Sequence, residues 1–564
     1  MRMRITATLV STLALAACAT TPNADRVTGG AGVAELQLLA LNDFHGNLEV
    51  PAAPTSYRSG EETLREVLGG AARLGATLDA LRAGQPNTIT VAAGDLIGAS
   101  PFVSANFLDE PSIMALNMVQ LDVASVGNHE FDRGVPELRR IQQGGCEQNT
   151  TRVACALEPF DGANFTYLAG NVVDQQGKSL FPGTATRQVG PARVGFIGLT
   201  LRDTATLVAP SATMGLSFVD EADTANRMAR ELLAQGVDTV VLLIHEGARV
   251  DPFMNVSGCP NLSGPILPIH ERLDPAISVI VSGHTHQGYV CELPMPGGGT
   301  RLLSSAGRYG AFVTDIRLTF DLATKRITAM HAANVPVRDD GAPRADIEAV
   351  VRRYADAAAP IAARVVGNIA PAAVEGVDCA ETAAADLVAD AQLAAGKREL
   401  GEDVDVAFIN TSGVRTGLAG ADDGMMTYGE IFSMQPFGNV LQVLEMSGSE
   451  MLAVLEEQFC NEGPATPCFT LLAPSANMTY TFDRSRPRGE RIVAAEIDGR
   501  AINEGATYQA VFNNFLASGG DGFASLASRR TVGEAGNDLD ALEAWLARGA
   551  TIPTCGRLRD VTPG

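Results

Sequence analysis

The chain has 564 residues, too many for one typical domain, so at least two domains are expected. With 46% hydrophobic and 19% charged residues, the composition is that of a globular protein and excludes a largely disordered one. The formal net charge of −23 disfavours contact with nucleic-acid backbone, and we predict no nucleic-acid partner. A small anionic substrate stays compatible with this charge, because bound metal cations dominate the field around them.

The first 17 residues have the pattern of an export signal. Arg2 and Arg4 precede an apolar run at 5–17 that is too short to span a bilayer comfortably. Leu15-Ala16-Ala17-Cys18 resembles a bacterial lipoprotein box, in which Cys18 becomes the lipidated first residue; an ordinary cleaved signal is the alternative. We predict a signal peptide at 1–17, a flexible tether at 18–33, and a protein anchored to a membrane through Cys18, in the periplasm or at the cell surface. No protein partner is predicted.

The nine cysteines suit an oxidising compartment, since removal of Cys18 leaves an even number. Zinc binding by cysteine is disfavoured because no CxxC pair occurs. Eight cysteines allow 105 pairings, so the connectivity stays open. As a guess at the pairing, Cys146–Cys155 and Cys460–Cys468 each bracket a short loop, Cys259 and Cys291 flank a strand-like run, and Cys379 and Cys555 are left to each other.

Strand-like apolar runs alternate with helical patterns from 34 to 336, which predicts an α/β domain. A helical pattern near 345–354 follows, and we predict a connector helix within 337–364. The region 365–564 opens with an alanine-rich helical pattern and contains further strand-like runs. It is predicted to form a smaller, mixed α/β domain.

Five apolar runs of the first region lead into possible metal ligands. Strand-like runs end in or just before Asp43 and His45, Asp95, Asn128, His245, and His284 and His286. Ligand sites of α/β sheets lie beyond the carboxyl ends of strands, so these side chains are expected to meet in one cleft. Oxygen and imidazole donors suit divalent metals such as zinc or manganese, and seven donors exceed the needs of one tetrahedral ion. Two ions that share one carboxylate would use them all, and such pairs typically serve phosphoryl transfer.

Taken singly, each of these residues has an ordinary explanation. An aspartate after a strand is usually a cap or turn residue, and a lone histidine is usually a surface or core group. Five of the seven histidines, however, stand at strand ends beside Asp or Asn, whereas His270 and His331 do not. The prediction depends on this joint occurrence.

In order along the chain, these elements resemble the signature of calcineurin-like metallophosphoesterases. The resemblance implies an αββα sandwich that holds two divalent ions. It assigns Asp43, His45, Asp95 and His286 to one ion, and Asp95, Asn128, His245 and His284 to the other, with Asp95 as the bridge. It also implies that His129 and Asp132 form a dyad that stabilises the transition state or the leaving oxygen; a helix cap is the alternative for Asp132.

Three segments of the second region carry possible substrate contacts. They contain Asn410 and Arg415, then Phe437, then Phe515 and Asp521. Two exposed phenylalanine rings suit a planar base, with stacking worth about 1–3 kcal/mol per base, although side-chain type alone favours a place in the core. The segments resemble those of periplasmic and ecto-5′-nucleotidases. That resemblance implies that both rings stack on the base, that Asn410 and Arg415 contact substrate, and that Asp521 binds ribose.

We therefore predict a 5′-nucleotidase that acts on a nucleotide substrate outside the cytoplasm. The segment 376–382 lacks an arginine that this family usually carries near a cysteine, which leaves the preference for mono- or polyphosphorylated nucleotides open. The same scaffold would suit a UDP-sugar diphosphatase, a 2′,3′-cyclic nucleotide phosphodiesterase or a thiosulfohydrolase, and the paired phenylalanines argue against the last. A non-catalytic nucleotide-binding surface lipoprotein is disfavoured because every expected metal ligand is present.

Overall fold

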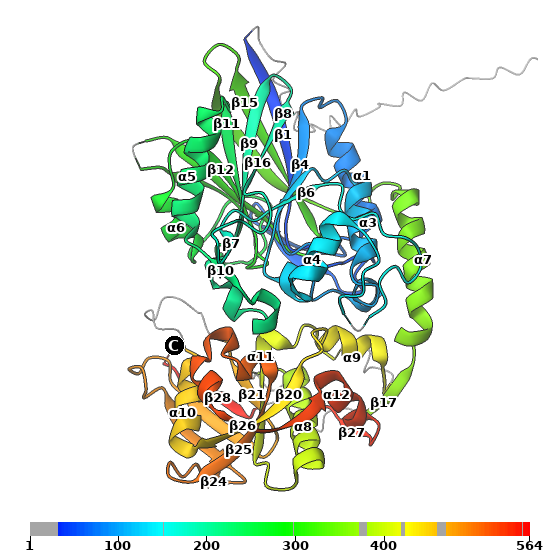
Figure 1. Cartoon of the computed structure of the whole chain (residues 1–564), viewed down its shortest axis with the longest axis vertical. Coiled ribbons are helices and arrows are strands. Elements are labelled where there is room, and N and C mark those ends of the chain that lie inside the picture. The colour runs from blue at the N-terminus through cyan, green and yellow to red at the C-terminus, as the bar shows by residue number, and fades with distance from the viewer. Residues whose placement is uncertain are drawn as a thin grey trace, which may run out of the picture.

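The computed structural model describes residues 32–150, 152–296, 298–370, 381–418, 424–459, 470–554 and 556–563. Two α/β domains lie one above the other in Figure 1, joined at one side by helix α7 (Ala345–Ala362). The predicted signal peptide, Cys18 and nearly all of the tether lie outside the described residues. Among the helices that the structure describes, none combines the length and the apolar character needed to cross a membrane.

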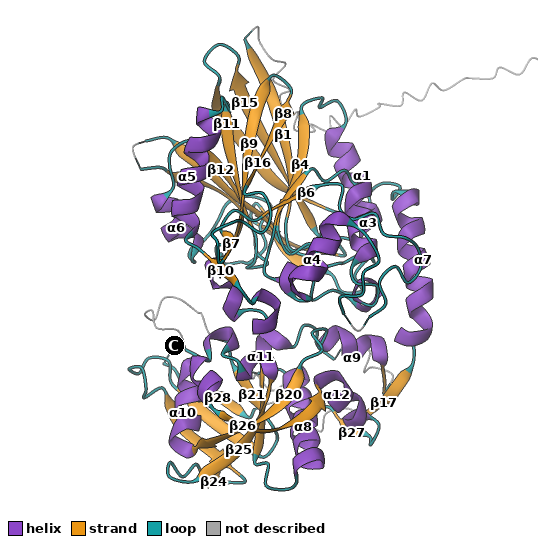
Figure 2. Cartoon of the chain, in the orientation of Figure 1, coloured by secondary structure: helices purple, strands orange, loops and turns teal. Residues whose placement is uncertain are grey.

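The first domain is built on two six-stranded sheets that pack face to face (Figure 2). The first sheet has the order β16 (Arg326–Pro336), β15 (Phe312–Asp321), β1 (Val33–Leu41), β4 (Thr88–Ala93), β5 (Val123–Ser125), β6 (Thr166–Leu168). The second has the order β13 (Gly288–Pro294), β14 (Thr300–Ala306), β12 (Ile277–Ser282), β11 (Thr239–His245), β9 (Ala192–Thr200), β8 (Thr184–Val189). The central strands are continuous apolar runs because both of their faces are buried.

Helices cover the two outer faces of this pair of sheets. Apolar residues such as Leu38, Val91 and Val241 fill the space between the sheets. The first sheet is covered by α1 (Ala71–Arg82), α3 (Glu110–Met118) and α4 (Gly134–Gln143), and the second by α5 (Glu221–Ala234) and α6 (Ile266–Arg272). The predicted αββα sandwich is therefore confirmed.

Shorter elements complete the first domain. They are β2 (Thr55–Ser59), β3 (Glu62–Glu66), α2 (Phe102–Ala105), η1 (His129–Phe131), β7 (Val172–Asp174), η2 (Arg202–Thr206), η3 (Pro210–Thr213) and β10 (Leu216–Phe218). Two disulfides also lie in this domain, Cys146–Cys155 and Cys259–Cys291, and both match the suggested pairing. The other two suggested pairs, Cys460–Cys468 and Cys379–Cys555, lie outside the described residues.

Helix α7 packs against both domains. Its buried residues include Val350 and Tyr354. They belong to one apolar cluster with Phe107 of the first domain and with Leu387 and Phe432 of the second. The two domains thus share a hydrophobic core beside the helix that joins them.

The second domain is a smaller α/β unit of three sheets. Its five-stranded sheet has the order β21 (Leu472–Pro474), β18 (Val406–Asn410), β25 (Thr507–Asn513), β20 (Val440–Ser447), β26 (Arg530–Asn537). A four-stranded sheet has the order β24 (Arg500–Ala501), β23 (Ile492–Ile497), β22 (Met478–Phe482), β28 (Leu558–Asp560). A three-stranded sheet has the order β19 (Met425–Thr427), β17 (Val365–Ala370), β27 (Ala550–Thr551). Helical elements are α8 (Ala383–Leu400), η4 (Thr411–Gly413), α9 (Tyr428–Met434), α10 (Gly448–Glu457), α11 (Asn514–Ala517), η6 (Gly520–Gly522), η7 (Ala524–Ser528) and α12 (Asp538–Leu546).

Candidate functional site

The seven predicted metal ligands come together at one edge of the sandwich. Strand β1 runs parallel to β4 and β4 parallel to β5, while β11 runs parallel to β12 in the other sheet. Their carboxyl ends therefore meet where the two sheets face each other. The residues there are Asp43 and His45 after β1, Asp95 after β4, Asn128 after β5, His245 at the end of β11, and His284 and His286 after β12.

The donor atoms form two neighbouring groups. In the first, His45 Nε2 lies 3.1 Å from His286 Nε2, and His286 Nε2 lies 3.4 Å from an oxygen of Asp43. In the second, the Asn128 side-chain oxygen lies 3.1 Å from both His245 Nε2 and His284 Nδ1. One oxygen of Asp95 lies between the groups, 3.6 Å from His45 Nε2 and 2.9 Å from His245 Nε2.

These donor sets fit divalent cations. The Nδ1–H of His45 donates to the carbonyl of Gly98 at 2.8 Å, and that of His245 donates to the carbonyl of Ala93 at 2.7 Å. Each backbone bond fixes the ring and turns the Nε2 lone pair toward the centre of the site, as in metal-binding histidines. Lone pairs that face lone pairs and carboxylates at such distances repel one another unless a cation or a proton lies among them.

The electrostatics of the buried site lead to the same conclusion. Burial raises the pKa of Asp43 to about 7 and lowers the pKa of His45 and of His284 to about 3, so those two imidazoles are neutral, as metal ligands must be. Burial alone would also lower the pKa of His245, but the Asp95 carboxylate raises it to about 10. His245 and Asp95 thus hold a proton between them, at the position where a divalent cation would bind both side chains.

Five of the ligand positions adopt left-handed backbone conformations. The φ angles are +49° at Asp43, +46° at His45, +50° at Asp95, +69° at His284 and +59° at His286. Such conformations are costly for residues other than glycine and concentrate at functional sites. Close approach also requires Gly94, where an added Cβ would lie 2.6 Å from the nitrogen of Gly127 and 2.8 Å from His245 Nδ1.

Two supporting residues were not assigned a role from the sequence. The buried carboxylate of Glu130 accepts hydrogen bonds from the backbone N–H groups of Asp95, Leu96 and Gly127 at 2.7–2.9 Å, and so ties two ligand loops together. The Asn42 amide donates to Asp43 at 2.6 Å. In the sequence, both residues stand beside predicted metal ligands in the same motifs, and this position could have indicated their supporting role.

His129 and Asp132 lie together at the border of the metal ligands. His129 Nδ1 is 3.0 Å from both Asp132 oxygens, and one of these oxygens also accepts the N–H of Ala99. Burial would lower the pKa of His129, but Asp132 and Asp95 outweigh it and raise this pKa. The pairing leaves His129 Nε2 directed away from Asp132, and the catalytic role of the dyad stays a prediction.

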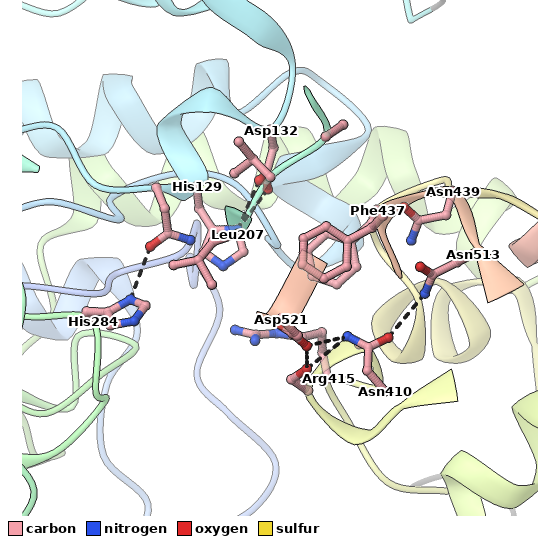
Figure 3. Close-up of a pocket in the computed structure, with 16 residues that line it drawn as sticks. His129, Asp132, Leu207, His284, Asn410, Arg415, Phe437, Asn439, Asn513 and Asp521 are labelled. Atoms are coloured by element: carbon pink, nitrogen blue, oxygen red, sulfur yellow. Dashed lines mark hydrogen bonds and ion pairs between the residues drawn. The ribbon is translucent and has the colours of Figure 1, made fainter. Parts of the chain in front are cut away.

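One hollow lies between the domains and is lined from both sides (Figure 3). The first domain contributes Asn128, His129, Asp132 and His284, and the second contributes all five predicted substrate residues, Asn410, Arg415, Phe437, Phe515 and Asp521. Asp95 and His286 line an adjoining hollow. Lining residues without a sequence prediction are Leu207, Val208, Ala209, Ser412, Gly413, Asn439 and Asn513. The stretch 207–209 carries no sequence signal, because only the packing of the domains brings it to the hollow.

Side chains of the second domain hold one another in place around this hollow. Asn410 donates to Asp521 at 2.8 Å and accepts from Asn513 at 3.1 Å. Phe437 and Phe515 are half-buried, so neither ring is enclosed in the core. The Phe437 ring stacks on His129 with centroids 5.9 Å apart and planes 18° apart. The aromatic wall thus lies directly beside the predicted dyad.

Comparisons with known proteins identify the two domains. Residues 36–288 match the model of calcineurin-like phosphoesterases, and residues 361–528 match that of the 5′-nucleotidase C-terminal domain. The chain is 30% identical to the endonuclease YhcR of Bacillus subtilis and 29% identical to a cell wall protein of Listeria monocytogenes, over 86% and 88% of its own length. It spans only 37% and 65% of the lengths of these two relatives.

A solved structure extends the likeness to the whole architecture. The 5′-nucleotidase precursor of Thermus thermophilus is 26% identical, with a TM-score of 0.74, over 94% of this chain and 100% of that one. The chain therefore belongs to the 5′-nucleotidase family, in which a calcineurin-like phosphoesterase domain is followed by a 5′-nucleotidase C-terminal domain.

Proposed function

We propose that the protein is a phosphohydrolase with two divalent ions that releases phosphate from nucleotides. The observation that carries the proposal is the single hollow bordered by metal ligands on one side and by Phe437 and Phe515 on the other. A nucleotide has the matching chemistry, with a phosphate at one end and a planar base at the other. The family implies divalent ions; their number rests on the two donor groups that share Asp95.

The residues of the chain have distinct tasks in this proposal. Divalent cations, when bound, supply Lewis acidity toward the phosphoryl oxygens and a lowered pKa for nearby water. Hydrolysis forms a bond between the oxygen of water and phosphorus and breaks the bond to the nucleoside oxygen. His129, held at Nδ1 by Asp132, keeps a proton that it presents to the charge developing on that leaving oxygen. Arg415 binds phosphate oxygens, while Asn410 and Asp521 bind the sugar.

The same proposal includes export and lipid anchoring through Cys18. It is supported by the basic start, the apolar run and the box Leu15-Ala16-Ala17-Cys18. Two disulfides in the first domain suit an oxidising compartment such as the periplasm.

A panel of substrates tests the proposed reaction. Phosphate release is measured from AMP, ADP, UDP-glucose, 2′,3′-cyclic AMP, thiosulfate derivatives and a small aryl phosphate, together with metal content. We expect release from nucleotides and about two divalent ions per chain. Turnover confined to cyclic nucleotides or to thiosulfate derivatives would overturn the assignment in favour of the corresponding alternative hydrolase.

A further inference from the structure

A second hollow adjoins the first, on the metal side of the interdomain space. Besides His129 and Thr285, it is lined by three predicted metal ligands and by three arginines: Asp95, His284, His286, Arg249, Arg308 and Arg415. Arg249 follows β11 and Arg308 follows β14, so both come from the first domain, whereas Arg415 comes from the second. In Figure 3 the Arg415 side chain extends from the second domain toward His284. Positive charge from both domains therefore converges beside the metal ligands.

Among the residues that the structure describes, no carboxylate forms an ion pair with any of these three arginines. Within the residues that the structure describes, none of the three guanidinium groups forms a hydrogen bond or an ion pair. Arg249 and Arg308 are exposed and Arg415 is half-buried. In a chain of net charge −23, three unpaired arginines around one hollow indicate a site for an anion.

The backbones that carry the two first-domain arginines are fixed. Arg249 pairs with Ser263 through two backbone hydrogen bonds of 2.8 and 2.9 Å. The guanidinium of Arg308 lies 4.8 Å from the ring centroid of Tyr309. Tyr309 in turn donates its N–H to the carbonyl of Asp43 at 2.6 Å, and its ring packs edge-on against His45 and His286. Through Tyr309, Arg308 is thus held beside the loop that carries the ligands Asp43 and His45.

The site carries more positive charge than one phosphate group would neutralise. The carboxylates of Asp43 and Asp95 cancel half the charge of two divalent cations, and a phosphomonoester dianion cancels the other half. His129 already faces Asp132. Arg249 and Arg308, beside Arg415, then remain for further negative charge, and a second phosphate group supplies it in a form that guanidinium groups bind bidentately.

We propose that Arg249 and Arg308, together with Arg415, form a subsite for a second phosphate group, so that the preferred ligand carries a pyrophosphate linkage. This inference rests on the proposed function, since it adds a phosphate subsite to the same nucleotide site. A nucleoside diphosphate and a nucleoside diphosphate sugar share the required chemistry.

Binding of non-hydrolysable analogues to the metal-loaded full chain tests the subsite without turnover. Isothermal titration calorimetry compares the α,β-methylene analogues of ADP and of UDP-glucose with a methylenephosphonate analogue of AMP. We expect wild type to bind at least one pyrophosphate analogue about tenfold or more tightly than the AMP analogue, the size expected for charged hydrogen bonds. Which of the two binds tightly distinguishes a free terminal phosphate from a sugar ester.

The double variant Arg249→Gln, Arg308→Gln should reduce this preference at least about threefold, roughly half the logarithm of the expected tenfold gain. Arg249→Lys, Arg308→Lys, which keeps the charge, should lose less. Arg326→Gln, an exposed change in β16 outside both hollows, is the matched control and should leave the preference unaltered. Metal content and thermal midpoint are measured for each variant. An unchanged preference, or an equal loss for all analogues, would overturn the subsite.

Failure of the proposed function would give a different experimental result from failure of the subsite. In that case wild type releases no phosphate from any nucleotide, and the nucleoside part is irrelevant. The arginines are then tested by methylenediphosphonate against inorganic phosphate, with the same variants and the same expected loss of preference. If wild type binds both equally, the subsite is overturned independently of the base.

Discussion

The two walls of the interdomain hollow are built in different ways. On the first-domain side, ligands stand on buried loops whose left-handed backbones, glycines and hydrogen bonds to Glu130 fix each atom. On the second-domain side, half-buried rings and a small hydrogen-bonded group around Asp521 define the surface. In the proposed function, the fixed loops of the first domain hold the metal-binding groups, whereas side chains of the second domain contact the substrate. Substitutions on the two walls should therefore have different consequences.

The largest effect is expected at Asp95, which lies between both donor groups. Asp95→Ala should lower activity by more than ~10³, beyond the roughly 10–100-fold loss typical of removing a residue that only orients a metal ligand. Bound metal should fall as well, because both groups lose a shared oxygen. Phosphate release and elemental analysis check this, and full metal content with normal turnover would separate Asp95 from the chemistry.

His129→Ala should lower kcat by roughly 10²–10⁴, the range for lost proton transfer, with metal content unchanged. The reason is that His129 lies beside the ligand Asn128 but belongs to the dyad with Asp132. His331→Ala, at an exposed histidine, serves as the control. Loss of metal in the His129 variant would assign it to the metal site instead.

On the second-domain wall, Phe437→Ala with Phe515→Ala should raise KM for nucleotides by roughly 5–150-fold, given about 1–3 kcal/mol of stacking per base. Hydrolysis of a small aryl phosphate should stay within a few-fold, since the metal ligands are untouched. Phe253→Ala, at an exposed ring outside both hollows, is the matched control. Equal loss for both substrates would make the two rings structural and remove the contrast between the walls.

The smallest effect on catalysis is expected from Cys18→Ser, because this residue is far along the chain from either wall. The variant should leave the membrane fraction and appear in soluble or unprocessed form, while kcat of the purified protein is unaltered. Fractionation and mass spectrometry of the mature amino terminus check this. An unmodified mature terminus downstream of Cys18 in wild type would contradict anchoring.

The positions of the metal-side residues were predictable because each follows an apolar run in order along the chain. Parallel pairing of β1 with β4 and of β11 with β12 then brings distant segments to one edge. The supporting roles were less accessible. Glu130 stands beside a ligand in its motif, but its hydrogen bonds to three backbone N–H groups, which join two ligand loops, are visible only in the structure.

The sequence predicted that substrate would bridge the two domains, but not the particular contacts between them. The stretch 207–209 has no distinctive residue, and it lines the hollow only because the first domain packs over the second. Exposed arginines are common, so Arg249 and Arg308 became notable only when the structure placed them beside metal ligands, with no ion pair to a described residue. The stack of Phe437 on His129 joins residues 308 positions apart (437 − 129), which no local pattern encodes.

The central claim is that phosphate and base are held by different walls of one hollow. A crystal structure of the metal-loaded protein with a non-hydrolysable nucleotide, recorded with anomalous scattering, tests it most directly. The account predicts two metal peaks that share Asp95, phosphate beside them, and the base between Phe437 and Phe515. A single peak, or a base bound away from both rings, would contradict it.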